Sequence, residues 1–340
     1  MSDRALESLD DLAAAGLVTP SEALRQVERQ FRIRVTPAMQ GGVADPGIAR
    51  QFLPSEAELD IREGELADPI GDDAHAPVPG LTHRYPDRVI LHVTRSCDVY
   101  CRFCFRREVV GGDGLLPEPD LARALDHVAR TPPIREVILT GGDPLTLSPR
   151  RIGAIIARLG QIDHLDQIRI HSRVPVVAPD RVGPDLLAAL RAPVPVWIVV
   201  HANHAAELGP EARAALGLLA DAGIPLLSQS VLLRGVNDSA DALEALFRAL
   251  LRLRVKPYYL HHCDLAKGAG HFRTTIAHGR ALMAELRLRL TGTGLPAYVL
   301  DIPGGFGKVP LTADHLEEVS PGRWIIRDPK GGRHAYADPD

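Results

Sequence analysis

The stretch Cys97-Asp98-Val99-Tyr100-Cys101-Arg102-Phe103-Cys104 contains three of the four cysteines of the chain. A spacing of C-x3-C-x2-C lets three thiols converge on one centre, and a cysteine binds metal as its thiolate. Iron-sulfur clusters of the [4Fe-4S] type normally take four cysteine ligands. Three ligands from a single loop would leave one iron open to a molecule other than the protein. The loop therefore predicts a reactive iron-sulfur cluster.

Zinc and a disulfide are the two other interpretations of this loop. Zinc takes four nitrogen or sulfur ligands, often from paired C-x2-C motifs, but the fourth cysteine, Cys263, lies far along the chain. A disulfide is disfavoured in a reducing compartment. We therefore favour a cluster over zinc and expect Cys263 to be a small buried side chain.

The composition of the chain indicates a globular enzyme of the cytoplasm. Its 340 residues, 45% of them hydrophobic, fit one α/β barrel with extensions. The 39 basic and 43 acidic residues give a net charge of −4, which offers no attraction to nucleic acid or to an anionic membrane. The N-terminus is charged, and no apolar run approaches the roughly 18 residues needed to cross a bilayer. We expect small-molecule partners.

Three regions are predicted. Residues 1–80 should form a helical and irregular accessory region, residues 81–308 a core barrel, and residues 309–340 a C-terminal extension. In the first region Leu6, Leu9 and Leu12 have helical spacing, and Ser21 is placed as a helix cap. In the last region, residues 324–326 could form a strand.

Short apolar runs alternate with amphipathic segments in the core, which indicates βαβ units and a parallel sheet. The predicted strands are residues 89–94, 137–140, 168–171, 196–200, 225–233 and 258–262. The predicted helices are residues 117–130, 149–159, 183–191, 209–222, 239–253 and 275–291. Six repeats are fewer than the eight of a closed barrel, so the expected fold is a partial one.

Polar residues follow these strands at their carboxyl ends, the face on which α/β barrels build active sites. In strand order they are the three cysteines, Gly141-Gly142-Asp143, Ser172-Arg173, His201 with Asn203, Ser228-Gln229 and Cys263-Asp264. Farther along, glycines precede Lys308. A nucleotide phosphate loop of the type G-x4-G-K-S/T is excluded, because Val309 follows the lysine.

The cysteine loop, with Phe103 before its last cysteine and Gly141-Gly142-Asp143 after the next strand, resembles the radical S-adenosylmethionine superfamily. Residues 79–88, 97–107, 232–238 and 257–273 resemble the lysine 2,3-aminomutase family, and the likeness runs from about residue 30 to about residue 312. The resemblance implies an α/β fold with a partial (βα)6 TIM-like barrel. It also implies three cofactors: a [4Fe-4S] cluster, S-adenosylmethionine and pyridoxal phosphate.

The resemblance assigns residues to the first two cofactors. Cys97, Cys101 and Cys104 would hold the cluster. The turn Gly141-Gly142-Asp143 is similar to the family's contact with the methionyl amine, and His201 and Gln229 would line the same cofactor. A plain backbone turn is the alternative explanation for the two glycines, whereas Asp143 at a strand end favours a cation partner.

The resemblance also assigns the pyridoxal phosphate site. Lys308 matches the lysine that forms the Schiff base, for which its ammonium must lose a proton; burial and a nearby cation promote that loss. Arg84 and Arg88 match the phosphate-binding arginines, and Tyr85 lies between them near the ring. Taken alone, these arginines would be surface charges.

Three further residues match substrate contacts of the family. Arg106 matches the arginine that grips the substrate carboxylate, a task suited to the bidentate guanidinium. Asp264 and Asp301 match the pair that receives the distal ammonium of lysine. Two carboxylates at this place favour a diamino acid over glutamate, although either could instead be a turn or cap aspartate.

The implied activity is that of an isomerase, a lysine 2,3-aminomutase that interconverts L-lysine and β-lysine. Alternatives are the (R)-β-lysine-forming type that serves elongation factor P, a mutase for glutamate, another amino acid or protein-bound lysine, and a non-catalytic iron-sulfur scaffold. His261 resembles the elongation factor P type, since longer enzymes have tyrosine there. Ser239 replaces a zinc-binding cysteine, so any homo-oligomer would lack a zinc-linked interface. The expected electron donor is a flavodoxin or ferredoxin.

Overall fold

A curled sheet forms the centre of the molecule. The computed structural model describes residues 4–112, 114–312, 315–321, 323–328 and 331–337. Within them the sheet has nine strands in sequence order, β1-β2-β3-β4-β5-β6-β7-β8-β9. Strands β2 to β8 pair in parallel, and β1 and β9 add antiparallel edges. The strands are Leu81–Tyr85, Arg88–Thr94, Glu136–Gly141, Gln167–Ser172, Val196–His201, Leu226–Leu232, Val255–His262, Ala297–Asp301 and Lys308–Pro310.

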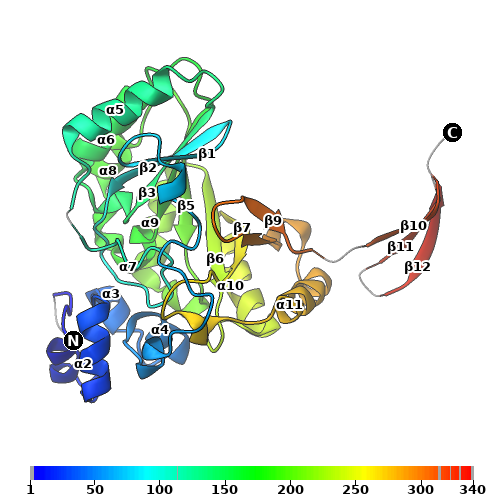
Figure 1. Ribbon diagram of the computed structural model, residues 1–340, viewed down its shortest axis with the longest axis horizontal. Helices are drawn as coiled ribbons and strands as arrows, with labels where there is room; N and C mark the ends of the chain where they lie inside the picture. Colours follow the sequence, from blue (N-terminus) through cyan, green and yellow to red (C-terminus); the bar gives the residue numbers. More distant parts are fainter. Residues whose placement is uncertain (1–3, 113, 313–314, 322, 329–330, 338–340) are drawn as a thin grey trace.

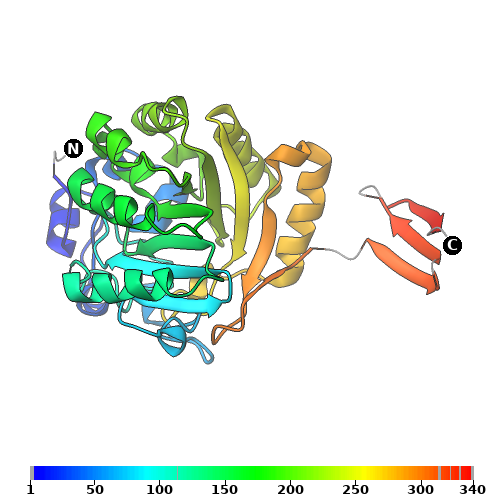
Figure 2. The ribbon, with the colours of Figure 1, turned by 90° about the horizontal axis from the view of Figure 1, so that it is seen from above.

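The predicted partial barrel is confirmed. The six predicted strands are β2 to β7, and the six predicted helices are α5 (Glu118–Ala129), α6 (Pro149–Leu159), α8 (Pro184–Ala189), α9 (Pro210–Asp221), α10 (Ala240–Arg252) and α11 (Ile276–Arg289). The helices cover the outer face of the sheet (Figure 2). The prediction missed β8, which is short and leads into a glycine-rich turn rather than a helix.

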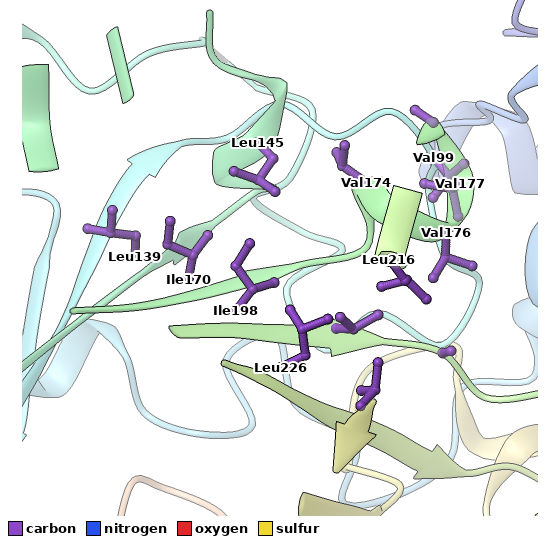
Figure 3. Packing of buried hydrophobic residues seen from close by; sticks show 14 of the residues in the cluster. Val99, Leu139, Leu145, Ile170, Val174, Val176, Val177, Ile198, Leu216 and Leu226 are labelled. Carbon is purple, nitrogen blue, oxygen red and sulfur yellow. The ribbon is translucent and has the colours of Figure 1, made fainter. Parts of the chain in front are cut away.

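Side chains along each strand point alternately to the face of the sheet that packs against the helices and to the face that lines a cavity. Leu139, Ile170, Ile198 and Leu226 pair in register across β3, β4, β5 and β6, and all are buried (Figure 3). Residues one position along point to the opposite face. In β4 that face carries Arg169 and His171, which line a cavity inside the barrel. The apolar core therefore lies between sheet and helices, and the polar residues lie inside the curl.

The N-terminal region contacts the cysteine loop. Its helices are α1 (Leu9–Ala14), α2 (Glu22–Gln30), α3 (Pro37–Gln40), α4 (Pro46–Phe52) and the short 3-10 turns η1 (Glu56–Leu59) and η2 (Asp73–His75), and Ser21 caps α2 as predicted. These helices lie at one end of the barrel, blue in Figure 1. Glu58, fully buried, binds both Arg102 and Arg107. Both arginines flank Cys104, so this region helps to hold the loop in place.

A small separate sheet follows the barrel. Strands β10 (Leu316–Ser320), β11 (Arg323–Arg327) and β12 (Arg333–Ala337) pair antiparallel and stand away from the barrel in Figures 1 and 2. Strand β11 confirms the strand considered at residues 324–326, and β10 and β12 were not predicted. The boundaries at residues 80 and 308 remain predictions. In the described ranges, no helix combines the length and the apolar character that a membrane crossing needs.

Candidate active site

A cavity of about 660 Å³ occupies the inside of the curled sheet. Its size is typical of small-molecule sites. It is lined by every residue that the sequence assigned to a cofactor or the substrate: Arg84, Tyr85, Arg88, Cys97, Cys101, Cys104, Arg106, Gly141, Gly142, Asp143, His201, Gln229, Asp264, Asp301 and Lys308. The fold thus brings residues from eight strands and the loops that follow them to one place.

The three loop cysteines are free thiols at one end of the cavity. Burial, followed by the nearby charge of Cys101, raises the pKa of Cys104 to about 11, and burial also raises the pKa of Cys97 and Cys101. Such thiols ionise at neutral pH only beside a strongly positive centre, which iron provides. In the described residues, no three His, Cys, Asp or Glu side chains surround a point for a single metal ion. In a cluster, by contrast, each cysteine binds its own iron, so the donor set fits the expected cluster.

The two glycines after β3 lie against the backbone that leads into the cysteine loop. The Gly142 N–H donates to the Thr94 carbonyl at 2.6 Å, and the Asp143 N–H donates to the Ser96 carbonyl at 2.8 Å. A Cβ atom on Gly142 would overlap the Ser96 carbonyl group, and Gly141 has φ +111°. The glycines are therefore required by backbone packing, in agreement with the plain turn weighed from the sequence.

The carboxylate of Asp143 is held in place by neighbouring residues. Its carboxylate accepts hydrogen bonds from the Ser172 hydroxyl at 2.7 Å and from the N–H groups of Leu145, Arg173 and Val174 at 2.6–3.1 Å. Burial raises its pKa to about 6 despite these donors. Backbone N–H groups at the starts of η3 (Pro144–Thr146) and α7 (Val174–Val177) bind both oxygens, and contact with a cationic group of the cofactor stays a prediction. Asp143 holds the turn after β3 against the end of β4.

His201 and Gln229 are neighbours on β5 and β6, where they pair in register. Both line the cavity, and Nε2 of His201 is buried without a hydrogen-bond partner in the described part of the chain. Burial, then the charge of Arg173, holds the pKa of His201 well below 6.5, so its ring is neutral at pH 7. A neutral ring with an unpaired buried nitrogen fits a polar cofactor at this wall.

The hairpin of β8 and β9 places Lys308 opposite Asp301. Lys308 Nζ lies 2.6 Å from Asp301 Oδ2, and His261 Nδ1 lies 3.3 Å from each of these atoms. The Lys308 backbone N–H donates to the Tyr85 hydroxyl at 2.8 Å, which ties strand β9 to β1 at the other edge of the sheet. The two sheet edges therefore meet beside the reactive amine.

Two arginines on the β1–β2 hairpin face the same part of the cavity. Arg84 Nη1 donates to the Ile70 carbonyl at 2.9 Å, and its buried Nε has no hydrogen-bond partner in the described residues. The Arg88 guanidinium lies 3.7 Å from the ring centre of Tyr85 and pairs with Asp87. Two cations and an unpaired donor beside Lys308 fit a phosphate-bearing aldehyde cofactor.

The expected substrate contacts are also oriented by neighbours. Arg106 Nε donates to Asp72 Oδ2 at 2.7 Å, which fixes one edge of its guanidinium. Asp264 is partly buried, and burial followed by repulsion from Asp301 raises its pKa to about 7. In Asp301, the hydrogen bond from His261 and the charge of Lys308 outweigh burial and hold the pKa well below its usual value. The two carboxyl groups therefore differ in charge before substrate arrives.

Several residues of the site received no role from the sequence. Arg173 was noted at a strand end without a role; the structure places its guanidinium on the sulfur of Cys101. Gln51 and Glu207 hold that arginine, and neither lies in a motif. Tyr259 lies under Lys308, with Nζ 5.0 Å from its ring centre. Only the folded chain brings Gln51 and Glu207 to Arg173, which lines the cavity.

Comparisons with known proteins agree with this geometry. The Radical SAM superfamily model matches residues 91–247. The L-lysine 2,3-aminomutase of Clostridium subterminale is 40% identical to this chain, and the match covers 94% of this chain and 78% of the relative. The enzyme of the same name from Fusobacterium nucleatum is 42% identical, and the match covers 86% of this chain and 69% of the relative. The glutamate 2,3-aminomutase of Clostridioides difficile is 35% identical, and the match covers 87% of this chain and 71% of the relative. The chain belongs to the lysine 2,3-aminomutase family of radical S-adenosylmethionine enzymes.

Proposed function

We propose that this isomerase moves the amino group of L-lysine between C2 and C3 and so interconverts L-lysine and β-lysine. The observation that carries the proposal is the placing of two carboxyl groups, Asp264 and Asp301, in the cavity that also contains Lys308 and the cysteine loop. Two acidic groups suit the distal ammonium of a diamino acid. Arg106, on the same wall, suits a carboxylate.

The family's cofactors are an iron-sulfur cluster, S-adenosylmethionine and pyridoxal phosphate. We assign Cys97, Cys101 and Cys104 to the cluster, and Gly141, Gly142, Asp143, His201 and Gln229 to the wall of the S-adenosylmethionine site. We assign Lys308, Arg84, Tyr85 and Arg88 to pyridoxal phosphate. When bound, these groups supply hydrogen-atom abstraction and a conjugated system that delocalises an unpaired electron.

His261 is suited to accept a proton from Lys308. The lysine must become a neutral amine before it can attack a carbonyl carbon. Burial, followed by the charge of Lys308, holds the pKa of His261 below 6.5, so its ring is neutral at pH 7. In the tautomer that carries its hydrogen on Nε2, Nδ1 lies 3.3 Å from Nζ and is a base within reach, and the Nδ1–H formed by the transfer can donate to Asp301 Oδ2. Asp301 holds the ammonium in place beside it.

Lysine and glutamate are the two substrates to be separated, because relatives of both kinds match the chain. The reconstituted protein would be incubated anaerobically with each amino acid, S-adenosylmethionine, pyridoxal phosphate and dithionite, followed by chiral analysis. We expect β-lysine from lysine and little product from glutamate, since Asp264 and Asp301 would repel a distal carboxylate. Isomerised glutamate beside unchanged lysine would refute the substrate and leave the cofactors in place.

Lysine turnover should depend on the ionisation of Asp264. With a pKa of about 7, its carboxyl is protonated below that pH and attracts the substrate ammonium only above it. The value of kcat/KM should therefore rise as pH increases through about 7. Asp264→Asn should remove this rise and lower kcat/KM by roughly 10- to 100-fold, the scale of a charged hydrogen bond.

A matched control for this prediction is Asp221→Asn, which changes an exposed aspartate far along α9. It should keep both the pH profile and the rate of the unmodified protein. A rise through pH 7 that survives in Asp264→Asn would assign the titration to another group.

The electron donor, the assembly and the product enantiomer belong to the same proposal. We retain a flavodoxin or ferredoxin as donor and a homo-oligomer without a zinc-linked interface. In support of the latter, the Ser239 hydroxyl caps α10 by accepting from the Ala242 N–H at 3.2 Å. The chiral assay separates the (R)-β-lysine of the elongation factor P type from the other enantiomer.

A further inference from the structure

We propose that Arg173 sets the reduction potential of the iron-sulfur cluster through a hydrogen bond to the sulfur of Cys101. The proposal rests on the proposed function, because it requires Cys101 to be a cluster ligand. The proposed effect of Arg173 passes through its contact with the Cys101 sulfur. It is a positioning residue that acts through the cysteine.

The guanidinium meets the cysteine inside the protein. Arg173 Nη1 lies 2.7 Å from Cys101 Sγ, and the arginine side chain is only 6% exposed. Its guanidinium carbon lies 4.6 Å from the ring centre of Phe52 and 5.4 Å from that of Phe103. The two rings keep the contact away from water. In such surroundings a charge-assisted hydrogen bond is stronger than at the surface.

The other edge of the guanidinium is anchored. Nη2 donates to Gln51 Oε1 and to Glu207 Oε2, each at 2.6 Å. Glu207 is fully buried, and its second oxygen accepts from the N–H groups of Asn203 and His204 at 2.8 Å. Arg173 is thus fixed between α4, the end of β4 and the turn η5 (Ala205–Glu207). It cannot rotate away from Cys101 without breaking this network.

Hydrogen bonds to the ligand sulfurs and the nearby charge are known controls of cluster potential. When the oxidised cluster accepts one electron, its thiolate ligands become more negative and no bond is made or broken. A donor fixed on Cys101 Sγ therefore stabilises the reduced state more than the oxidised one. Because Glu207 offsets much of the cationic field, the directed N–H bond should carry most of the effect.

The test compares Arg173→Lys and Arg173→Gln with the unmodified protein. Lysine keeps a cation for Glu207, but its single ammonium cannot also reach the sulfur as the guanidinium fork does. Arg158→Gln is the matched control, since it removes an arginine on the outer helix α6 that pairs with Glu118. Each protein is reconstituted anaerobically with iron and sulfide, and iron and sulfide are assayed before any potential is measured.

Potentials are measured by titration with dithionite, followed by electron paramagnetic resonance, without S-adenosylmethionine. That omission separates an effect on the cluster from one on cofactor binding. We expect Arg173→Lys and Arg173→Gln to disfavour reduction about tenfold, equivalent to 59 mV for a one-electron couple. Arg158→Gln should leave the potential unchanged. Equal potentials in Arg173→Lys and the unmodified protein would overturn the proposal.

Two outcomes are distinguished before that comparison. An unmodified protein that takes up no iron and sulfide refutes the proposed function itself. If the variants take up less iron than the unmodified protein, their potentials are not compared. The test is then made on the unmodified protein, prepared with arginine that is isotope-labelled in the guanidinium nitrogens. Its reduced cluster should show hyperfine coupling to those nitrogens. Absence of the coupling would overturn the role of Arg173 even though the cluster is present.

Discussion

Lysine 2,3-aminomutase turnover should fall by roughly four orders of magnitude when Lys308 is replaced by methionine, the scale seen when one member of a cooperating catalytic set is lost. Methionine has no amine to bond the carbonyl carbon of pyridoxal phosphate. It also removes the cation that lies 2.6 Å from Asp301, so a buried carboxylate loses its partner. Turnover would be measured anaerobically from L-lysine.

The same Lys308→Met protein should keep its iron and sulfide, because the cysteine loop lies on other elements. It should lose the visible absorbance that protein-bound pyridoxal phosphate gives. Lys267→Met is the matched control, since the Lys267 side chain is 44% exposed and its Nζ lies 3.8 Å from Glu108, away from the cavity residues. Undiminished turnover in Lys308→Met would show that another group binds the cofactor.

A single methyl group at Gly142 should almost abolish both cluster assembly and turnover. The added Cβ would lie 2.7 Å from the Arg95 carbonyl carbon and would overlap the Ser96 carbonyl oxygen. These are backbone atoms directly before Cys97, so the cysteine loop itself would have to move. A displacement near 1 Å in a catalytic site costs about 100-fold in rate. Iron per chain after reconstitution and the rate of lysine isomerisation would report the effect.

Gly217→Ala is the control for the methyl group alone. Gly217 lies within α9, and a Cβ there would meet no atom within 4 Å. Alanine should stabilise this helix by about 0.5–1 kcal/mol, measured by thermal unfolding, with the iron content unchanged. Normal iron content in Gly142→Ala would mean that the loop can shift without losing the cluster.

Local patterns were enough to predict the barrel. Apolar residues of β4, such as Ile168 and Ile170, alternate with residues that face the cavity, and this period of two marks a strand whatever its neighbours are. The strand-end residues were predictable for the same reason, because parallel strands bring their carboxyl ends to one face. The resemblance then named the residues of the cavity, and the structure places all of them on its wall.

Contacts between distant segments could not be predicted. The carboxylate of Asp143 binds the backbone of residues that follow a different strand. Glu58 has no motif around it, yet it is the buried partner of Arg102 and Arg107. The residues next to Glu58 in the sequence do not show whether its carboxylate is buried or in water. Folding decides this, because it removes water from the carboxylate and from its arginine partners.

The sequence by itself determined the order of strands and helices, the three-cysteine loop and the identity of the residues at the strand ends, because these depend on local periodicity and spacing. Only the tertiary structure decided that Lys308 pairs with Asp301 and His261, and that Arg173 donates a hydrogen bond to Cys101. Arg173 and Cys101 lie 72 positions apart, and the bond of Arg173 to Gln51 joins residues 122 positions apart. Which residues meet depends on the curl of the sheet and on burial, and neither can be derived from a short stretch of sequence.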